Sequence, residues 1–191
     1  MTVALDHLVA AVGAALDDDR HTSDRARVDV MRAPMRALLA AEEPIPAWAE
    51  EPHDGAAVGN LLHADPSGRF HILAVVFPEG TSSGVHHHGC WGVIGYLRGG
   101  DEETRYAEVD GAPAEASRHV WHQGDVTDLL PEEGEGWHRV RNPGPGVGVS
   151  VHVLCRSPGD HPHLFWDRAE GRTVAFPFVE VAPQRWVAQL A

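Results

Sequence analysis

Two kinds of hydrophobic spacing divide the chain. Up to about residue 40 the spacing is helical, with an apolar stripe at Val3, Leu5, Leu8, Val9, Val12 and Leu16. The run Asp17–Asp19 breaks this stripe, and either Thr22 or Ser23 is a suitable N-cap for a second helix with Asp24 in its first turn. Pro34 predicts an interruption of that helix, or the start of a short third one.

From about residue 58 the spacing changes to two, which is typical of strands bounded by turn residues. Residues 42–57 are rich in proline and are expected to form an irregular connection. Eight or nine short strands after a helical lead predict an all-β barrel or sandwich. The expected strands are 58–63, 69–77, 92–98, 102–109, 118–123, 126–130, 137–141, 147–154 and, as a last strand, 173–181.

The length of 191 residues fits one domain, in which 1–57 form helices and a connection packed on a barrel of 58–191. A net charge of -13 repels phosphate backbones and anionic lipids, so we expect a small diffusing substrate and neither nucleic acid nor membrane as a partner. The only two cysteines, Cys90 and Cys155, make no disulfide framework. No signal peptide or membrane-spanning stretch is recognisable, so the expected location is cytoplasmic. The sequence leaves the oligomeric state open.

Histidine is the unusual part of the composition, with fourteen residues, three of them consecutive at positions 86–88. Residues two apart on a strand share a face, so His86 and His88 can bind one metal ion while His87 points away. His138, on a separate expected strand, would complete one triangular face of an octahedron and leave positions open for substrate and oxygen. A surface pair, or an unspecific metal-binding histidine patch, is the alternative interpretation.

Two segments resemble the two sequence motifs of the cupin superfamily. In the first, five residues separate a glycine from a His-x-His pair; in the second, a Gly-Asp pair and a proline precede a histidine with an asparagine four residues later. The resemblance implies the cupin double-stranded β-helix, a jelly-roll barrel, with the histidines as metal ligands. The matching residues are Gly80, His86, His88, Gly124, Asp125, Pro131, His138 and Asn142.

More narrowly, the stretch from Asn60 to about Asp167 is similar to the cysteine dioxygenase family of thiol dioxygenases, especially its bacterial members. This covers somewhat over half the chain, and its matches include 61–65, 86–95, 103–106 and 150–153. The resemblance implies an Fe(II) site made of histidines alone, and residues 89–93 indeed contain no carboxylate. Three neutral imidazoles leave the metal its full charge, which favours a bound thiolate. The same ligands also suit zinc, nickel or manganese.

The resemblance also assigns Ser150 and His152 to the start of a Ser-His-Tyr relay beside the iron. Position 154, where the tyrosine is expected, is leucine, so another polar group replaces the phenol or the reaction differs. The alternative for Ser150 and His152 is a hydrogen-bonded pair within a strand. Leu154 itself, like Asn60, Cys90 and Arg98, is a candidate substrate-binding residue.

The arginine that holds the substrate carboxylate in this family is also missing, and Asn60 lies in that stretch. Either Arg98 or Arg172 serves instead, or the substrate lacks an α-carboxylate. Cys90, two residues after His88, would approach the metal from an extended strand, although packing is the commoner role of a buried thiol. Residues that could form a rim over the cavity, or ordinary surface, are His161, His163, Phe165 and Trp166.

Together these features predict a non-haem iron dioxygenase that oxidises the sulfur of cysteine or a related small thiol with O₂ to a sulfinate or related product. One alternative is another cupin oxygenase, isomerase or hydrolase with a different metal. The other is a non-catalytic metal-binding sensor or storage protein.

Overall fold

The computed structural model describes residues 1–134, 136–157, 163–175 and 178–188. The chain begins with α1 (Val3–Asp17), α2 (Asp24–Leu39) and the short 3-10 helix η1 (Ala47–Glu50). Thr2 and Ser23 cap the two long helices, each accepting a backbone N–H three residues on. The helical lead and its break are therefore confirmed. Within the residues described, no helix is long and apolar enough to cross a membrane.

Pro34 lies inside α2 and does not end it, so the predicted interruption there is wrong. A proline in a helix interior costs about 3 kcal/mol. The helix nevertheless continues because it buries a stripe of four apolar side chains, Val28, Met31, Met35 and Leu38, against the rest of the protein. Each such burial contributes roughly 1.5–3 kcal/mol, which together exceeds the cost of the proline.

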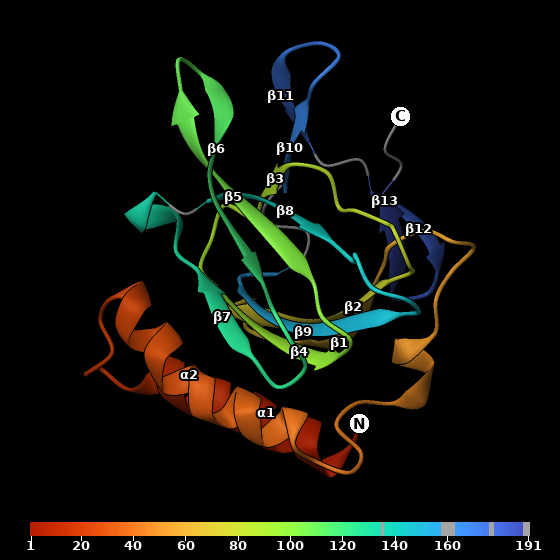
Figure 1. Ribbon diagram of the computed structural model, residues 1–191. Helices are drawn as coiled ribbons and strands as arrows, with labels where there is room; N and C mark the ends of the chain where they lie inside the picture. The colour runs from red at the N-terminus through yellow and green to blue at the C-terminus, as the bar shows by residue number, and fades with distance from the viewer. Residues whose placement is uncertain (135, 158–162, 176–177, 189–191) are drawn as a thin grey trace.

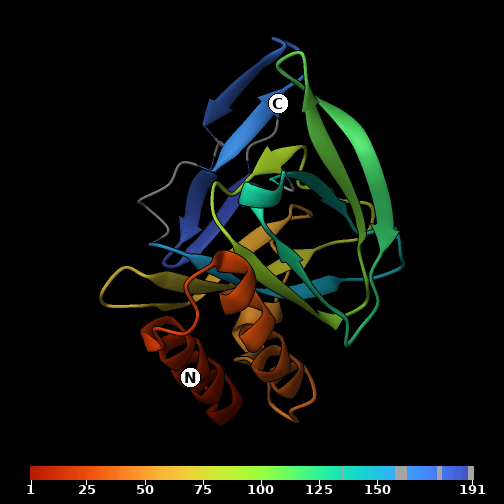
Figure 2. The same ribbon diagram turned by 90° about the vertical axis from the view of Figure 1, so that its left-hand side faces the viewer.

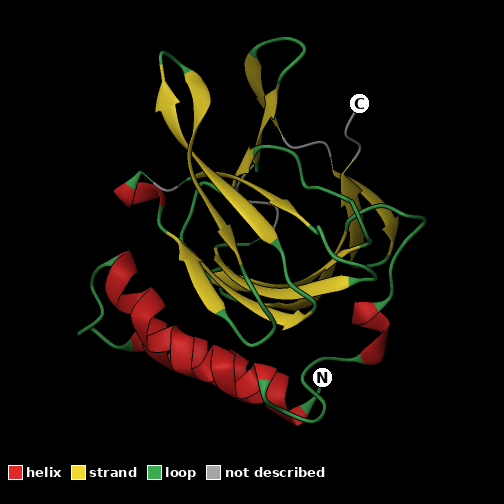
Figure 3. Cartoon of the chain, viewed as in Figure 1, coloured by secondary structure: helices red, strands yellow, loops and turns green. Residues whose placement is uncertain are grey.

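The strands form two antiparallel sheets (Figures 1 and 3). The seven-stranded sheet consists, in spatial order, of β12 (Phe178–Ala182), β13 (Arg185–Ala188), β1 (Val58–Ala64), β2 (Phe70–Phe77), β9 (Gly148–Cys155), β4 (Gly92–Arg98) and β7 (Val126–Leu129). The six-stranded sheet consists of β11 (Arg172–Ala175), β10 (Leu164–Asp167), β3 (His86–His87), β8 (Trp137–Arg141), β5 (Glu102–Val109) and β6 (Ala112–Val120). A second 3-10 helix, η2 (Pro131–Glu133), follows β7.

The eight strands from β2 to β9 have jelly-roll topology. Counted one to eight along the chain, they lie in the order 1-8-3-6 in one sheet and 2-7-4-5 in the other, with all neighbours antiparallel. The chain thus passes repeatedly between two facing sheets, as in a double-stranded β-helix. The predicted all-β barrel with an N-terminal helical extension is confirmed. Strands β1 and β10–β13 lengthen the two sheets beyond this barrel.

The two helices cover the outer face of the seven-stranded sheet (Figures 1 and 2). Side chains alternate along β2, so Ile72, Ala74 and Val76 join the core under the helices while the residues between them face the barrel interior. Helix α2 approaches β4 closely at Gly95, where a Cβ atom would lie 2.7 Å from the Met35 side chain.

Several strand boundaries differ from expectation. The turn after β5 consists of Asp110 and Gly111, both with positive φ, so β6 begins at Ala112, well before the predicted residue 118. The single last strand expected at 173–181 is instead divided into β11 and β12, with residues 176–177 between them outside the described residues, and β13 follows a turn at Gln184, which has positive φ. The short strands β3 and β10 were not expected, because two and four residues carry no measurable periodicity.

Candidate metal centre

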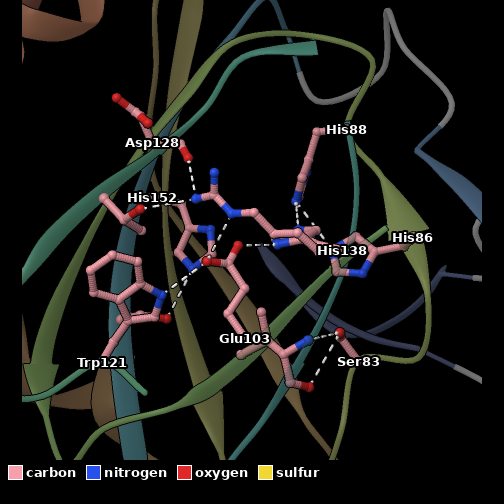
Figure 4. Close-up of polar contacts among 12 residues, drawn as sticks. Ser83, His86, His88, Glu103, Trp121, Asp128, His138 and His152 are labelled. Atoms are coloured by element: carbon pink, nitrogen blue, oxygen red, sulfur yellow. Dashed lines mark hydrogen bonds and ion pairs between the residues drawn. The ribbon is translucent and has the colours of Figure 1, made fainter. Parts of the chain in front are cut away.

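Three imidazoles meet inside the barrel at the ends of two adjacent strands. His86 on β3 lies directly opposite His138 on β8, and His88 follows just after β3. Their Nε2 atoms form a triangle with all three edges 3.1 Å long. All three residues are buried, and Figure 4 shows the rings turned toward one another. The predicted convergence of these histidines is therefore confirmed.

The local backbone explains why His88 joins the group although β3 ends at His87. Gly89 has φ +68°, so the chain turns directly after His88. The ring of His87 points to the other side, where it packs on Trp137 with 5.4 Å between ring centroids and accepts the Gly89 N–H at 2.7 Å. His87 is outside the candidate ligand group, as predicted.

The triangle fits a metal ion. Around a metal with bonds to nitrogen of about 2.1 Å, neighbouring ligands lie about 3.0 Å apart in an octahedron and about 3.4 Å apart in a tetrahedron. The observed 3.1 Å matches three neighbouring octahedral positions, which leaves three others for exogenous ligands. Within the described ranges, the group contains histidine alone and no carboxylate. The cluster is thus compatible with a resident divalent metal.

Protonation favours metal binding at the same atoms. Burial, with smaller contributions from neighbouring histidines, lowers the pKa of His86 and His88 well below 6.5, so both rings are neutral near pH 7. His86 Nδ1 donates to the Gly84 carbonyl at 3.2 Å, and His138 Nδ1 donates to Glu103 Oε1 at 2.9 Å. These hydrogen bonds place the proton on Nδ1, which leaves the lone pair of Nε2 for a metal.

Glu103 on β5 is a supporting residue that the sequence reasoning did not single out as functional. Its other oxygen, Oε2, accepts the Trp121 indole N–H at 2.9 Å and lies 3.2 Å from Arg105 Nε (Figure 4). Burial opposes ionisation, but the hydrogen bond from His138, with Arg105 and Trp121, outweighs it and lowers the pKa of Glu103 to about 2. The alternation of Glu103 and Arg105 on one strand face was the available signal, but their register with His138 was not readable from the sequence.

Ser150 and His152 lie on the face of β9 that looks into the barrel, and Ser150 Oγ is 2.9 Å from His152 Nε2. Both are buried, and burial lowers the pKa of His152 to about 3. The rings of His152 and His88 are 6.5 Å apart between centroids. The pair therefore stands beside the histidine cluster without belonging to it.

A cavity of about 80 Å³ opens beside the cluster. Its walls come from both sheets and from the C-terminal strands. The lining residues described are Ala57, Val58, Gly59, Leu73, Val75, Phe77, Ser83, His86, His88, His138, Val140, His152, His163 and Trp186. His163, just before β10, packs edge-on against His88 with 4.7 Å between ring centroids. Of the residues considered for a rim, it alone is among the described lining, and His161 lies outside the described residues.

No family model matches this chain. Among solved structures, it is similar to a cupin superfamily protein from Desulfitobacterium hafniense (TM-score 0.45, 16% identity, 63% of this chain and 96% of that one). It is also similar to a protein from Bacillus halodurans, with a TM-score of 0.48 and 13% identity over 61% of this chain and 83% of that one. A cupin domain from Bordetella pertussis matches with a TM-score of 0.42 and 17% identity over 56% of this chain and 100% of that one. The order of strands β2 to β9 is itself that of a double-stranded β-helix. The chain has the cupin fold.

In this cupin barrel, the residues suggested for substrate binding lie away from the cavity. Asn60 is on the opposite face of β1 and donates to the Ala49 carbonyl at 2.9 Å. Arg98, at the end of β4, forms an ion pair with Glu50 at 3.3 Å. Arg172 is exposed on β11. The side-chain alternation of the strands explains these placements, because each residue falls on the outer face or beyond the barrel edge.

Cys90 does not approach the cluster, because the turn at Gly89 ends the extended backbone that the prediction required. Its Sγ lies 3.3 Å from the Cys155 carbonyl oxygen on the helix side of the sheet, and both cysteines are free. Leu154 is fully buried on β9, opposite Gly92 of β4, and is absent from the described lining of the cavity.

Proposed function

We propose that this cupin is a mononuclear non-haem iron dioxygenase that oxidises the sulfur of a small thiol. The overall reaction, RSH + O₂ → RSO₂H, moves both oxygen atoms to sulfur, which loses four electrons as O₂ gains them. The observation that carries the proposal is the triangle of three histidine Nε2 atoms. Among the described residues no carboxylate belongs to this group, and the group borders a cavity. The similarity to thiol dioxygenases in the sequence supports the choice of sulfur.

The charge of the site supports a thiolate ligand. His86, His88 and His138 would hold Fe(II) as neutral ligands, leaving a net charge of two on the site. A bound Fe(II) would supply adjacent coordination positions for thiolate and O₂ and the redox chemistry that joins them. The chain's own contribution is to keep three lone pairs aimed at one point.

The walls of the cavity keep bulk water away from the reacting sulfur. Leu73, Val75 and Phe77 on β2 and Val140 on β8 form an apolar surface beside the cluster. Ser150 and His152 add a polar pair near the cluster. His152 lines the cavity, and its Nε2 is hydrogen-bonded to the Ser150 hydroxyl. In this proposal the pair takes the place that the missing phenol at position 154 would have had, orienting the bound thiol or O₂ by hydrogen bonds.

The proposal is tested by loading tag-free protein anaerobically with Fe(II) and adding a panel of small thiols under ¹⁸O₂. The expected result is thiol-dependent O₂ uptake, with two labelled oxygen atoms in a sulfinate product detected by mass. Zn(II)-loaded protein is the matched control and should take up none. Fe(II)-loaded protein that consumes no O₂ with any thiol contradicts the proposal, and so would equal O₂ uptake by the Zn(II)-loaded protein, because the reaction would then not need a redox-active metal.

A further inference from the structure

The cavity beside the histidine cluster has no cationic side chain other than imidazole. The sequence contains fifteen basic residues, all of them arginine, and every one is within the described ranges. None of these arginines lines the cavity. A substrate carboxylate entering this space would find no guanidinium or ammonium to pair with.

Two arginines that could be considered as partners for a carboxylate are already engaged. Arg105 lies 3.2 Å from the Glu103 carboxylate and donates to the Asp128 carbonyl at 2.8 Å. Arg98 is paired with Glu50 at 3.3 Å, outside the barrel. Either arginine would have to leave its ion pair to reach a substrate. For Arg105 that partner is Glu103, the carboxylate that supports His138.

The remaining wall is mostly apolar. Phe77 and Trp186 contribute aromatic faces, and Leu73, Val75 and Val140 contribute aliphatic ones. No carboxylate is among the described lining residues either, so this part of the wall offers an ammonium group no counterion. Burying an unpaired ionised group in such a space is strongly unfavourable.

From this lining we infer that the cavity selects small neutral thiols, such as alkyl or hydroxyalkyl thiols, and discriminates against thiols that carry a carboxylate or an ammonium group. This inference rests on the proposed function for the thiol itself. The volume of about 80 Å³ allows only a few non-hydrogen atoms beyond the sulfur. The sulfur would then be the sole charged atom of the substrate, neutralised by the metal.

Gly59 offers a place to reverse this selectivity. It lies on β1, lines the cavity, and is paired with Val75 and Trp186 on the neighbouring strands. A Cβ atom there would meet only the Trp186 carbonyl oxygen, at 3.9 Å, which is an ordinary contact. A longer side chain at this position therefore starts from the cavity wall without a backbone clash. Gly59→Arg adds a guanidinium that could pair with a carboxylate, and Gly59→Met, with an unbranched neutral side chain, is the control for lost space.

The experiment uses Co(II)-loaded protein under anaerobic conditions and follows sulfur-to-cobalt charge-transfer absorption. The probes share a two-carbon link to sulfur: propane-1-thiol, 3-mercaptopropan-1-ol, 3-mercaptopropionate and 2-aminoethanethiol. The wild type should bind the two neutral thiols at least tenfold more tightly than the two charged ones. Relative to its affinity for propane-1-thiol, the affinity of Gly59→Arg for 3-mercaptopropionate should rise at least tenfold over that of the wild type, and Gly59→Met should show no such rise.

Equal or tighter binding of 3-mercaptopropionate by the wild type overturns the inference, whether or not the variants fold. So does a Gly59→Arg protein that binds cobalt and propane-1-thiol but shows no such rise in relative affinity for the carboxylate. Oxygen uptake by the Fe(II) form separates this test from that of the proposed function. Selective binding of neutral thiols without O₂ uptake would support the selectivity and contradict the dioxygenase activity. Oxygen uptake that is fastest with carboxylated thiols would support the dioxygenase activity and contradict the selectivity.

Discussion

Glu103 Oε1 accepts a hydrogen bond from His138 Nδ1 at 2.9 Å, and both side chains are almost completely buried. This carboxylate acts on the metal centre through an imidazole and does not itself join the ligand group. It fixes the ring orientation and increases the basicity of Nε2. Both sheets supply walls of the cavity, and the Glu103–His138 hydrogen bond within the six-stranded sheet holds one ring of the cluster in place.

Glu103→Gln is expected to weaken metal affinity by roughly 10–100-fold, because an amide cannot orient and polarise His138 as a carboxylate does. Affinity is measured by competition with a chromophoric chelator. The control is Glu102→Gln, since Glu102 neighbours it on β5 but pairs with Arg118 at 3.7 Å near the surface. Equal affinities in wild type and Glu103→Gln would show that the carboxylate has no role at the centre.

Ser150→Ala is expected to lower thiol-dependent O₂ uptake about tenfold while the metal content stays unchanged. The hydroxyl is the partner of His152 Nε2, and His152 Nδ1 is buried with no hydrogen-bond partner among the described residues. Removing the hydroxyl leaves that ring unsatisfied, at a cost of about 1–3 kcal/mol of stability. Ser117→Ala on the exposed strand β6 is the control. Unchanged uptake and stability in Ser150→Ala would rule out a positioning role.

The metal-free protein should lose stability as the pH falls below about 6.5. Burial lowers the pKa of His86 and His88 well below the ordinary 6.5, and that of His152 to about 3. At pH values between 6.5 and these lowered pKa values, the unfolded chain binds protons that the folded chain does not. The free energy of unfolding is therefore greatest above pH 6.5 and falls as the pH is lowered. Each such histidine contributes a slope of about 1.4 kcal/mol per pH unit.

This decline is measured as the urea midpoint of chelator-treated protein from pH 7.5 to pH 5. His152→Asn should show a shallower slope, because one of the titrating groups is gone. The Glu103 carboxylate adds nothing to this window, since its pKa of about 2 confines its own loss of stabilisation to pH values below 4.5. A midpoint independent of pH between 7 and 5 would contradict the burial of neutral histidines.

Two glycine substitutions should have opposite effects on stability. Gly95→Ala places a methyl group 2.7 Å from Met35 between β4 and α2, so it should destabilise the protein by about 1–3 kcal/mol. Gly13→Ala lies in the middle of α1, where the nearest atom is 4.0 Å away, so it should stabilise by about 0.5–1 kcal/mol. Both are compared by urea denaturation. A neutral Gly95→Ala would show that the helices do not pack as tightly as described.

The sequence allowed the barrel and the ligand histidines to be predicted for a physical reason. Side chains two apart on a strand share a face, so the alternation along β2 and β9 and the pair His86 and His88 were readable locally. The resemblance to the cupin motifs then joined His138 to that pair across fifty residues. The strand alternation and the meeting of these three histidines therefore followed from local spacing and from those motifs.

The rest depended on distant pairings or on single backbone torsions. Glu103 reaches the centre because β5 pairs with β8 in one particular register, which no local pattern encodes. Trp186 reaches the cavity because β13 pairs with β1, more than a hundred residues away. Cys90 was placed wrongly because one positive φ at Gly89 turned the chain. Pro34 was overridden by the burial of the stripe around it.

The central claim is tested most directly by an anomalous difference map from a crystal of tag-free protein loaded with Fe(II) or Co(II) without oxygen. We expect one strong peak at about 2.1 Å from the Nε2 atoms of His86, His88 and His138. No carboxylate should coordinate it, and a crystal of the His138→Ala variant should lack the peak. Rings that point apart, or a Glu or Asp completing the coordination, would contradict the all-histidine centre.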